Sequence, residues 1–139
     1  MMIRRQLSLT DLVSAIQKQI NDNTDLKCLD IVPENTMPPV VYIEVVRVSP
    51  VDSKTFYMKE YEVYVHIIAD GQRSSVPVYT IIQDVQEAMT ANIELPDYVR
   101  LVTQTDAGVQ TLYTYQATDE KHAVLAYVFQ IAYGYKMKI

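Results

Sequence analysis

Hydrophobic side chains recur with helical spacing in two segments of the chain. Apolar positions return every three or four residues from Leu9 to Ile20, which predicts an amphipathic helix. Ser8 can cap the start of this helix, and Asn21-Asp22-Asn23 ends it. The same spacing runs from Val78 to Met89, after the helix-start signal Ser74-Ser75-Val76-Pro77. We therefore expect two amphipathic helices.

The stretches between and after these helices follow strand-like patterns. The β-branched run Val40 to Val48 predicts a strand, because such side chains pack well on a pleated surface. Phe56 to Ala69 alternates between apolar and wetter positions, which predicts a long strand with one solvated side. The polar segment Ser49 to Thr55 lies between them. A hairpin with a longer loop is the expected result.

The last third of the chain is less uniform. Tyr98 to Thr105 is typical of a strand, and Asp106-Ala107-Gly108 is typical of a turn. We assign no element to the polar, aromatic stretch Val109 to Lys121. From Ala123 to Met137 the alternation of apolar residues predicts a long final strand.

Together these elements predict an α+β fold. Their order is helix, strand, strand, helix, strand, strand, and residues 1–139 are expected to form a single domain. Two amphipathic helices would pack on one face of a mostly antiparallel sheet of about four strands. The second face would carry Tyr, Glu, His and Gln side chains.

Charge and cysteine content narrow the classes of function. The net charge is −5, with 17 acidic and 12 basic residues, and the basic residues are scattered along the chain. Sequence-specific nucleic-acid binding is therefore disfavoured, since phosphate contacts need a basic stripe. The single cysteine, Cys28, excludes an internal disulfide and is expected to be a small buried hydrophobe. No segment reads as a signal peptide or a membrane span, so we expect a protein made in the cytoplasm.

The chain offers no recognisable nucleotide or metal site. Phosphate-cradling loops need clustered glycines, and the three glycines lie far apart in the sequence. His66 and His122 fall in separate predicted strands, and we expect half-exposed strand residues rather than a pair of ligands. No cofactor is expected.

Catalytic constellations are equally missing from the sequence. Ser74 and Ser75 lack the surroundings of an activated nucleophile and suit helix capping. Glu60 and Glu62 share a strand face, where they could form an acid and base pair, but a solvated face explains them more simply. We therefore do not expect an enzyme.

Tyrosine is the compositional anomaly, with 11 residues against two phenylalanines and no tryptophan. A tyrosine side chain combines a large apolar ring with a polar tip. Packing across sheet faces accounts for many of these residues. Alternatively, they belong to faces that are buried against neighbouring subunits.

Two local motifs resemble the tail-terminator, or tail-completion, proteins of long-tailed bacteriophages and prophages. The stronger one is Tyr64-Val-His-Ile-Ile-Ala-Asp70, followed by Gly71-Gln-Arg-Ser-Ser75 and the helix Val78 to Met89. In that family a strand with a similar ending leads through a Ser-rich turn into an amphipathic helix. The proline-bounded Met37-Pro-Pro-Val-Val-Tyr-Ile43 is the second.

The resemblance implies a structural assembly protein. Such a protein caps the tail tube, stops its elongation and offers a joining surface to the head connector. Its expected partners are copies of itself in a hexameric ring, the tail-tube protein and the head-connector or neck protein, with no membrane involved. Its expected location is the tail-head junction of the virion, after assembly in the host bacterial cytoplasm. From loop character alone, the candidate contact residues are Asp52, Ser53, Lys54, Asp106, Asp119 and Lys121.

Two alternatives stay open at this point. One is another neck or head-completion component, which would share the virion context. The other is a small-molecule-binding regulatory α+β domain that acts as a dimer, because folds of this size host many functions. A closed apolar pocket with convergent polar groups would favour the latter.

Overall fold

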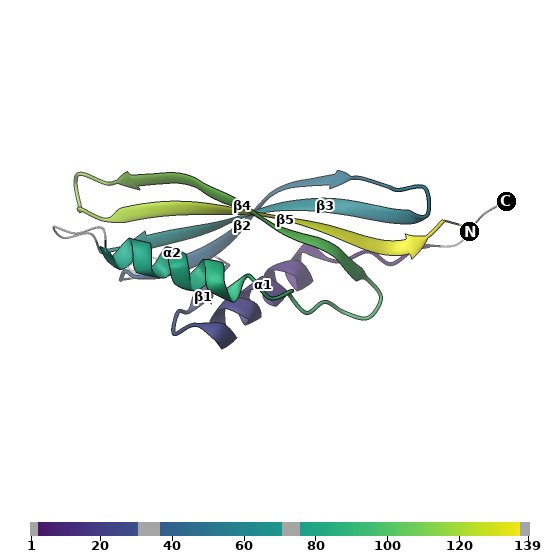
Figure 1. Ribbon diagram of the computed structural model, residues 1–139, viewed down its shortest axis with the longest axis horizontal. Coiled ribbons are helices and arrows are strands. Elements are labelled where there is room, and N and C mark those ends of the chain that lie inside the picture. The colour runs from purple at the N-terminus through teal and green to yellow at the C-terminus, as the bar shows by residue number, and fades with distance from the viewer. Residues whose placement is uncertain (1–2, 31–36, 71–75, 137–139) are drawn as a thin grey trace.

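The computed structural model describes residues 3–30, 37–70 and 76–136. These ranges form a single five-stranded sheet with two helices against one of its faces (Figure 1). The expected α+β class and the placement of both helices on one face are confirmed. The elements are α1 (Leu9–Asn23), β1 (Cys28–Leu29), β2 (Val40–Pro50), β3 (Phe56–Ala69), α2 (Val76–Ala88), β4 (Arg100–Thr114) and β5 (Lys121–Tyr135).

Helix α1 begins and ends with side chains that satisfy its terminal backbone groups. The Ser8 Oγ accepts a hydrogen bond from the Asp11 backbone N–H at 3.0 Å, as predicted for an N-cap. At the other end the Thr24 hydroxyl donates to the Ile20 carbonyl at 2.6 Å. The Asn21 Oδ1 then accepts from the Cys28 N–H at 2.7 Å and so fixes the start of β1. Polar side chains therefore set the length of the helix and aim the chain into the sheet.

The sheet has the strand order β1-β2-β3-β5-β4, and its neighbours are antiparallel except for β1 and β2. Strand β1, which the sequence analysis missed, is short and pairs in parallel with Val41 and Tyr42. The turn between β2 and β3 and the turn between β4 and β5 lie at opposite ends of the long axis (Figure 1). The long strands therefore carry side chains from one end of the molecule to the other.

The core lies between the helices and one face of the sheet. Alternate residues of β3 and β5 point into it, and Val65 pairs with Leu125 at its centre. Removing a side chain such as Ile16, which is fully buried, would cost about 2–5 kcal/mol. The main contributors are Leu12, Ile16, Ile20, Val41, Ile43, Val63, Val65, Ile67, Val78, Val85, Leu125, Tyr127, Phe129 and Ile131.

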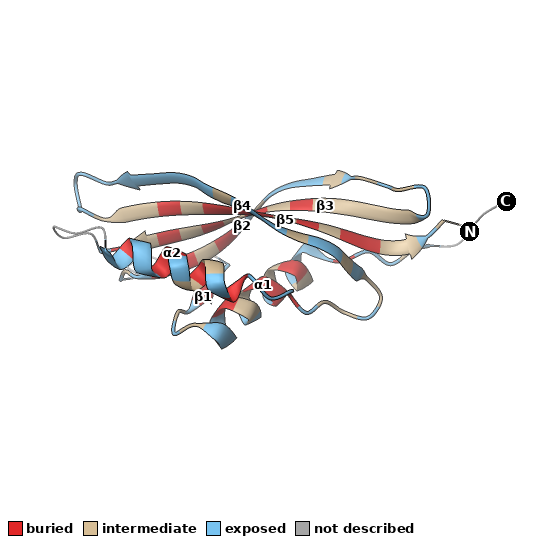
Figure 2. Ribbon diagram, in the orientation of Figure 1, coloured by how far each residue is buried: buried red, intermediate tan, exposed pale blue. Residues whose placement is uncertain are grey.

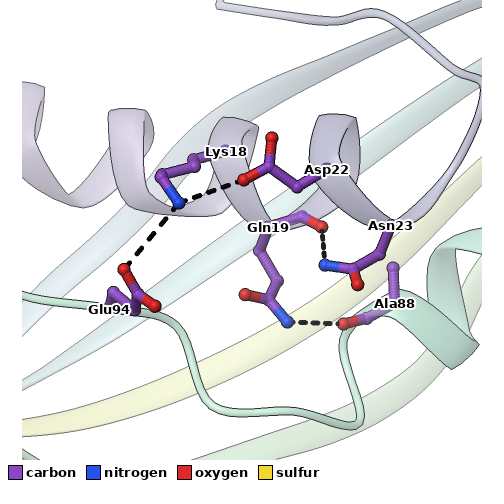
Figure 3. Close-up of polar contacts among 6 residues, drawn as sticks. All are labelled: Lys18, Gln19, Asp22, Asn23, Ala88 and Glu94. Carbon is purple, nitrogen blue, oxygen red and sulfur yellow. Dashed lines mark hydrogen bonds and ion pairs between the residues drawn. The ribbon is translucent and has the colours of Figure 1, made fainter.

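Polar contacts join the two helices at one point (Figure 3). The Gln19 Nε2 donates to the Ala88 carbonyl at 2.9 Å, at the end of α2. Lys18 lies 3.0 Å from Asp22 on the same helix and 3.8 Å from Glu94, which follows α2. These contacts hold the segment after α2 against α1. The lysine pairs are exposed, so we expect them to add little stability.

One of the local predictions for the last third was wrong, and one stretch had been left unassigned. Asp106-Ala107-Gly108 is not a turn but part of β4, which continues to Thr114. The stretch from residue 109, which we left unassigned, divides into the end of β4, a turn over residues 115–120, and the start of β5 at Lys121. The register of β4 shifts between Asp106 and Gly108, and Gly108 has a φ of +91°. A glycine in this conformation allows the strand to bulge and continue, where turn propensity suggested an ending.

Candidate assembly surfaces

Strand β4 forms one open edge of the sheet. It is 15 residues long, and no described strand pairs with its outer side. Most of it is exposed, as the pale blue ribbon of β4 shows (Figure 2). Exposed apolar side chains on it include Val102 and Leu112, each 47% exposed, and Val109, which is 42% exposed. A long edge with unpaired backbone groups and apolar side chains is a template for another strand.

Strand β2 forms the opposite edge, which is partly covered. Strand β1 pairs with β2 at Val41 and Tyr42, and beyond Tyr42 no described strand lies on that side. The uncovered second half of β2 carries Val46 and Val48, which are 42% and 39% exposed. The short β1 therefore leaves one defined part of this edge available for pairing.

Three exposed apolar residues of the two edges lie on the same face of the sheet. Val48 pairs with the buried Tyr61, while Val109 and Leu112 pair with the buried Leu125 and Ala123. Directly opposed residues in a sheet point to the same side. All three therefore extend the helix-covered core face to both edges, beyond the area that the helices cover.

The strand directions make the two edges complementary. Each step from β2 through β3 and β5 to β4 is antiparallel, so β2 and β4 run in opposite directions. If a second copy continued the sheet, its β2 would run antiparallel to β4 of the first copy. Both edges also contain register shifts, one in β2 and three in β4. Such bulges bend and twist an edge, which limits pairing to a partner of matching curvature.

The helix-free face carries a row of aromatic and histidine side chains. The rings of Tyr42 and His66 stack at 4.5 Å, and the His66 Nε2 lies 2.8 Å from a Glu44 carboxylate oxygen. His122 packs against Tyr113 and Tyr115 at ring distances of 5.0 and 4.4 Å. Burial lowers the pKa of His122, which favours the neutral ring. Within the described part of the chain, no cluster of three or more His, Cys, Asp or Glu could hold a metal ion.

Two of the residues considered as possible catalytic groups, Glu60 and Cys28, have structural roles. The Gln130 Nε2 donates to a Glu60 carboxylate oxygen at 3.0 Å, on the same helix-free face. Cys28 is buried, and burial raises the pKa of its thiol to about 12. The proposed capping role of Ser74 and Ser75 lies outside the described residues.

The candidate loop residues separate into three places: the β2–β3 loop, the middle of β4 and the β4–β5 turn with the start of β5. Asp52, Ser53 and Lys54 lie in the loop after β2, as predicted. The Asp52 carboxylate accepts from the Met58 N–H at 3.0 Å, and the Ser53 hydroxyl accepts from the Phe56 N–H at 2.9 Å. These side chains hold the loop together, and Lys54 is exposed.

Of Asp106, Asp119 and Lys121, which we predicted to lie in a loop, only Asp119 does so. Asp106 lies inside β4 rather than in a loop, and its carboxylate accepts from the Gly108 N–H at 2.7 Å across the bulge. Lys121 is the first residue of β5, where its Nζ donates to the Thr114 hydroxyl at 2.7 Å. Asp119 does lie in the turn, with a φ of +58°.

The sequence analysis missed the edge residues Val48, Val109 and Leu112. The available signal was the apolar pair Val109 and Leu112 within an otherwise polar stretch. Such a pair indicates an edge once the stretch is known to be a strand. Because we predicted a turn at Asp106 to Gly108, we did not recognise that one strand continues through these residues to Thr114.

The sequence matches a known family over nearly its whole length. The model of phage tail terminator family 4, described as "Putative tail termination protein", matches residues 2–139. The chain belongs to this family. The resemblance noted from the sequence is confirmed, and the chain is a phage structural tail protein. A search of curated protein sequences finds no match.

A solved structure shares the fold of this chain. It is a chain of the structure titled "Virion of native gene transfer agent (GTA) particle". The TM-score is 0.73 at 16% sequence identity, and the match covers 88% of this chain and 96% of the other. At this identity the similarity concerns the fold. None of the described helices is long and apolar enough to cross a membrane.

Proposed function

We propose that this tail terminator closes the growing end of the tail tube as a ring of copies. The ring stops elongation at the tail-head junction and offers a joining surface to the head connector. The observation that carries the proposal is the pair of unlike open edges, β2 and β4, on one subunit of a tail termination family. A closed ring requires two different complementary patches on each subunit.

The side chains at the edges support contact between copies. Through the strand pairings Val48 lies level with Gln104 of its own β4. Joining β4 of one copy to the uncovered half of β2 of the next would therefore bring Val48 towards Val109 and Leu112 only with the two copies staggered along the strands. Fully burying a Val or Leu side chain contributes about 1.5–3 kcal/mol. Each subunit gains such a contact at both edges when the ring closes. An open chain of subunits would leave one edge exposed at each end, which favours closure.

Oligomeric state and tube binding test this function. Light scattering after size exclusion, with negative-stain images of the same peak, measures whether the protein forms rings. The same sample is then mixed with tubes polymerised from the tail-tube protein. We expect ring-shaped particles at tube ends and an arrest of further tube growth. A stable dimer that does not bind the tubes would refute the proposal and favour the regulatory alternative.

Edge variants test the arrangement of the ring. Val48→Lys blocks the β2 edge and Leu112→Lys blocks the β4 edge, so each variant alone is expected to be monomeric. A mixture of the two should form a dimer that grows no further, because one intact edge remains on each copy. Tyr79→Lys, at a residue 53% exposed on α2, is the matched control and should leave the ring intact. Rings that persist in both edge variants would exclude pairing through these edges.

A further inference from the structure

Charged residues are distributed unequally along the strands. One end of the sheet carries the β2–β3 turn, the start of β4, the end of β5 and the N-terminal segment (Figure 1). Among the described residues of this end, the basic ones outnumber the acidic ones, which are Asp11, Asp52, Glu60, Glu62 and Asp97. We call this the basic end, after Arg4, Arg5, Arg47, Lys54, Lys59, Arg100 and Lys136.

The opposite end of the sheet is acidic. It comprises the start of β2, the end of β3, and the β4–β5 turn with the strand ends that it joins. The charged residues that the structure describes there are the acidic Glu44, Asp70, Asp119 and Glu120 and the basic Lys121. The net charge of −5 for the whole chain therefore conceals a basic end.

The basic end is also hollowed and aromatic. Two adjacent open hollows, of about 380 and 460 Å³, share Phe56 and Arg100 in their linings. The first continues over Tyr98 and Tyr133 to Tyr135, which is 68% exposed and packs at 4.9 Å from the Phe56 ring. Exposed aromatic rings beside cationic groups are typical of protein contact sites.

Two arginines are held beside the first hollow by aromatic rings. The Arg4 guanidinium lies 4.2 Å from the centre of the Tyr57 ring, and the Arg5 guanidinium lies 3.8 Å from that of Tyr98. The Tyr98 hydroxyl donates to the Asp11 carboxylate at 3.1 Å, which anchors the ring under Arg5. Cation–π stacking orients both guanidinium groups without neutralising their charge. They can therefore still pair with carboxylates of a partner.

We infer that the basic end docks an acidic surface of another virion protein, with Arg4, Arg5 and Arg100 pairing its carboxylates and Tyr135 packing against its apolar side chains. This inference rests on the proposed function, because a ring at the tail-head junction must meet different partners on its two sides. Sheet ends of opposite charge give the ring two unlike faces. Complementary charge then decides which face each partner meets.

The chemistry of the basic end favours a protein over a nucleic acid. Asp97 lines the first hollow, and Asp52 lies 3.8 Å from the Lys136 Nζ. These carboxylates would repel a phosphate backbone, whereas a protein surface with mixed charges can accommodate them. The apolar lining by Met58, Leu101 and Val102 also suits side chains better than phosphates.

Charge reversal tests the inference on the intact chain. Binding to polymerised tail tubes and to purified head connector is measured by co-sedimentation for the wild type and for the double variant Arg4→Glu/Arg5→Glu. We expect affinity for one partner to fall by about tenfold or more, and the wild-type affinity for that partner to weaken with added salt. Affinity for the other partner should not change. Tyr135→Ser, which leaves the charge unaltered, should weaken the same interaction.

The matched control is Lys18→Glu/Lys27→Glu, an equal charge change at exposed residues outside the basic end. It should leave both interactions unaltered. If the wild type binds both partners and Arg4→Glu/Arg5→Glu binds each of them as tightly as the wild type does, the inference fails while the proposed function stands.

Two other results would assign the basic end to a different partner. Loss of the ring in Arg4→Glu/Arg5→Glu would mean that the basic end forms contacts between copies. Tight binding of a labelled DNA duplex to the wild type would mean that it binds nucleic acid. A wild type that binds neither partner would refute the proposed function itself.

Discussion

The Gln104 side chain joins the edge strand β4 to the end of α2, because its Nε2 donates to the Met89 carbonyl at 2.9 Å. The same Nε2 donates to the Ala91 carbonyl at 2.9 Å, and the Oε1 accepts from the Ile93 N–H at 2.9 Å. Gln104→Ala would remove this partner from the partly buried Met89 carbonyl and Ile93 N–H. We expect the free energy of unfolding to fall by about 1–3 kcal/mol, measured by urea denaturation.

Gln110→Ala is the control for this substitution, because it removes an exposed glutamine from the same strand. The Gln110 Nε2 donates to the Ala107 and Gly108 carbonyls, which stay accessible to water. Its effect should stay within about 0.5 kcal/mol. Equal losses in both variants would show that Gln104 does not clamp the connection after α2.

Cys28 should be unreactive in the folded protein. Its side chain is 2% exposed, and the pKa of about 12 leaves almost no thiolate at neutral pH. We expect a thiol reagent such as 5,5′-dithiobis(2-nitrobenzoate) to label the native protein far more slowly than the urea-unfolded chain. Rapid labelling without denaturant would mean that the β1 segment opens readily.

Sequence patterns predicted the elements that bury a regular face. Leu12, Ile16 and Ile20 recur at helical spacing, and Val63 and Val65 alternate, because each set contacts the same core. Apolar patterns therefore predicted both helices and the three long strands that have a buried face, β2, β3 and β5. The cap at Ser8 was predicted for a similar reason, since it depends on residues three positions apart.

Elements without a buried face could not be recognised in this way. Strand β4 is exposed along most of its length, so its alternation carries little signal, and Gly108 resembles a turn residue. The two residues of β1 are too few to show any period. The basic end is assembled from Arg4, Arg100 and Lys136, which are distant in sequence and meet through the strand register. Only the folded sheet brings such charges together.

Core and edge residues of the sheet should respond differently to truncation. Phe129 is fully buried, and we expect Phe129→Ala to lower the free energy of unfolding of the monomer by about 3–5 kcal/mol. Leu112→Ala removes a half-exposed side chain, so its effect on the monomer should stay within about 0.5 kcal/mol. Chemical denaturation at a concentration below ring formation measures both. A large monomer loss for Leu112→Ala would mean that this edge already contributes to the core of one subunit.

His122 should make the folded protein less stable in mild acid. Burial is the main cause that lowers its pKa from the ordinary value of 6.5, and the neighbouring His66 acts in the same direction, while Glu120 opposes them. The unfolded chain therefore binds a proton at His122 more readily than the folded one. The free energy of unfolding is then highest above the unfolded-state pKa and falls as the pH drops through it towards the lower folded-state pKa.

The variant His122→Phe isolates this effect, because a phenyl ring can retain the packing on Tyr113 and Tyr115 without titrating. Urea denaturation of the wild type and the variant between about pH 8 and about pH 5 gives the difference in unfolding free energy at each pH. We expect the free energy of unfolding of the variant to rise relative to that of the wild type as the pH falls below about 6.5, the ordinary pKa of histidine. The Nε2 of His122 is buried with no hydrogen-bond partner, so a proton there has no acceptor to offset its charge. A difference that stays constant across this range would show that His122 is hydrated in the folded state and that the aromatic row opens to solvent.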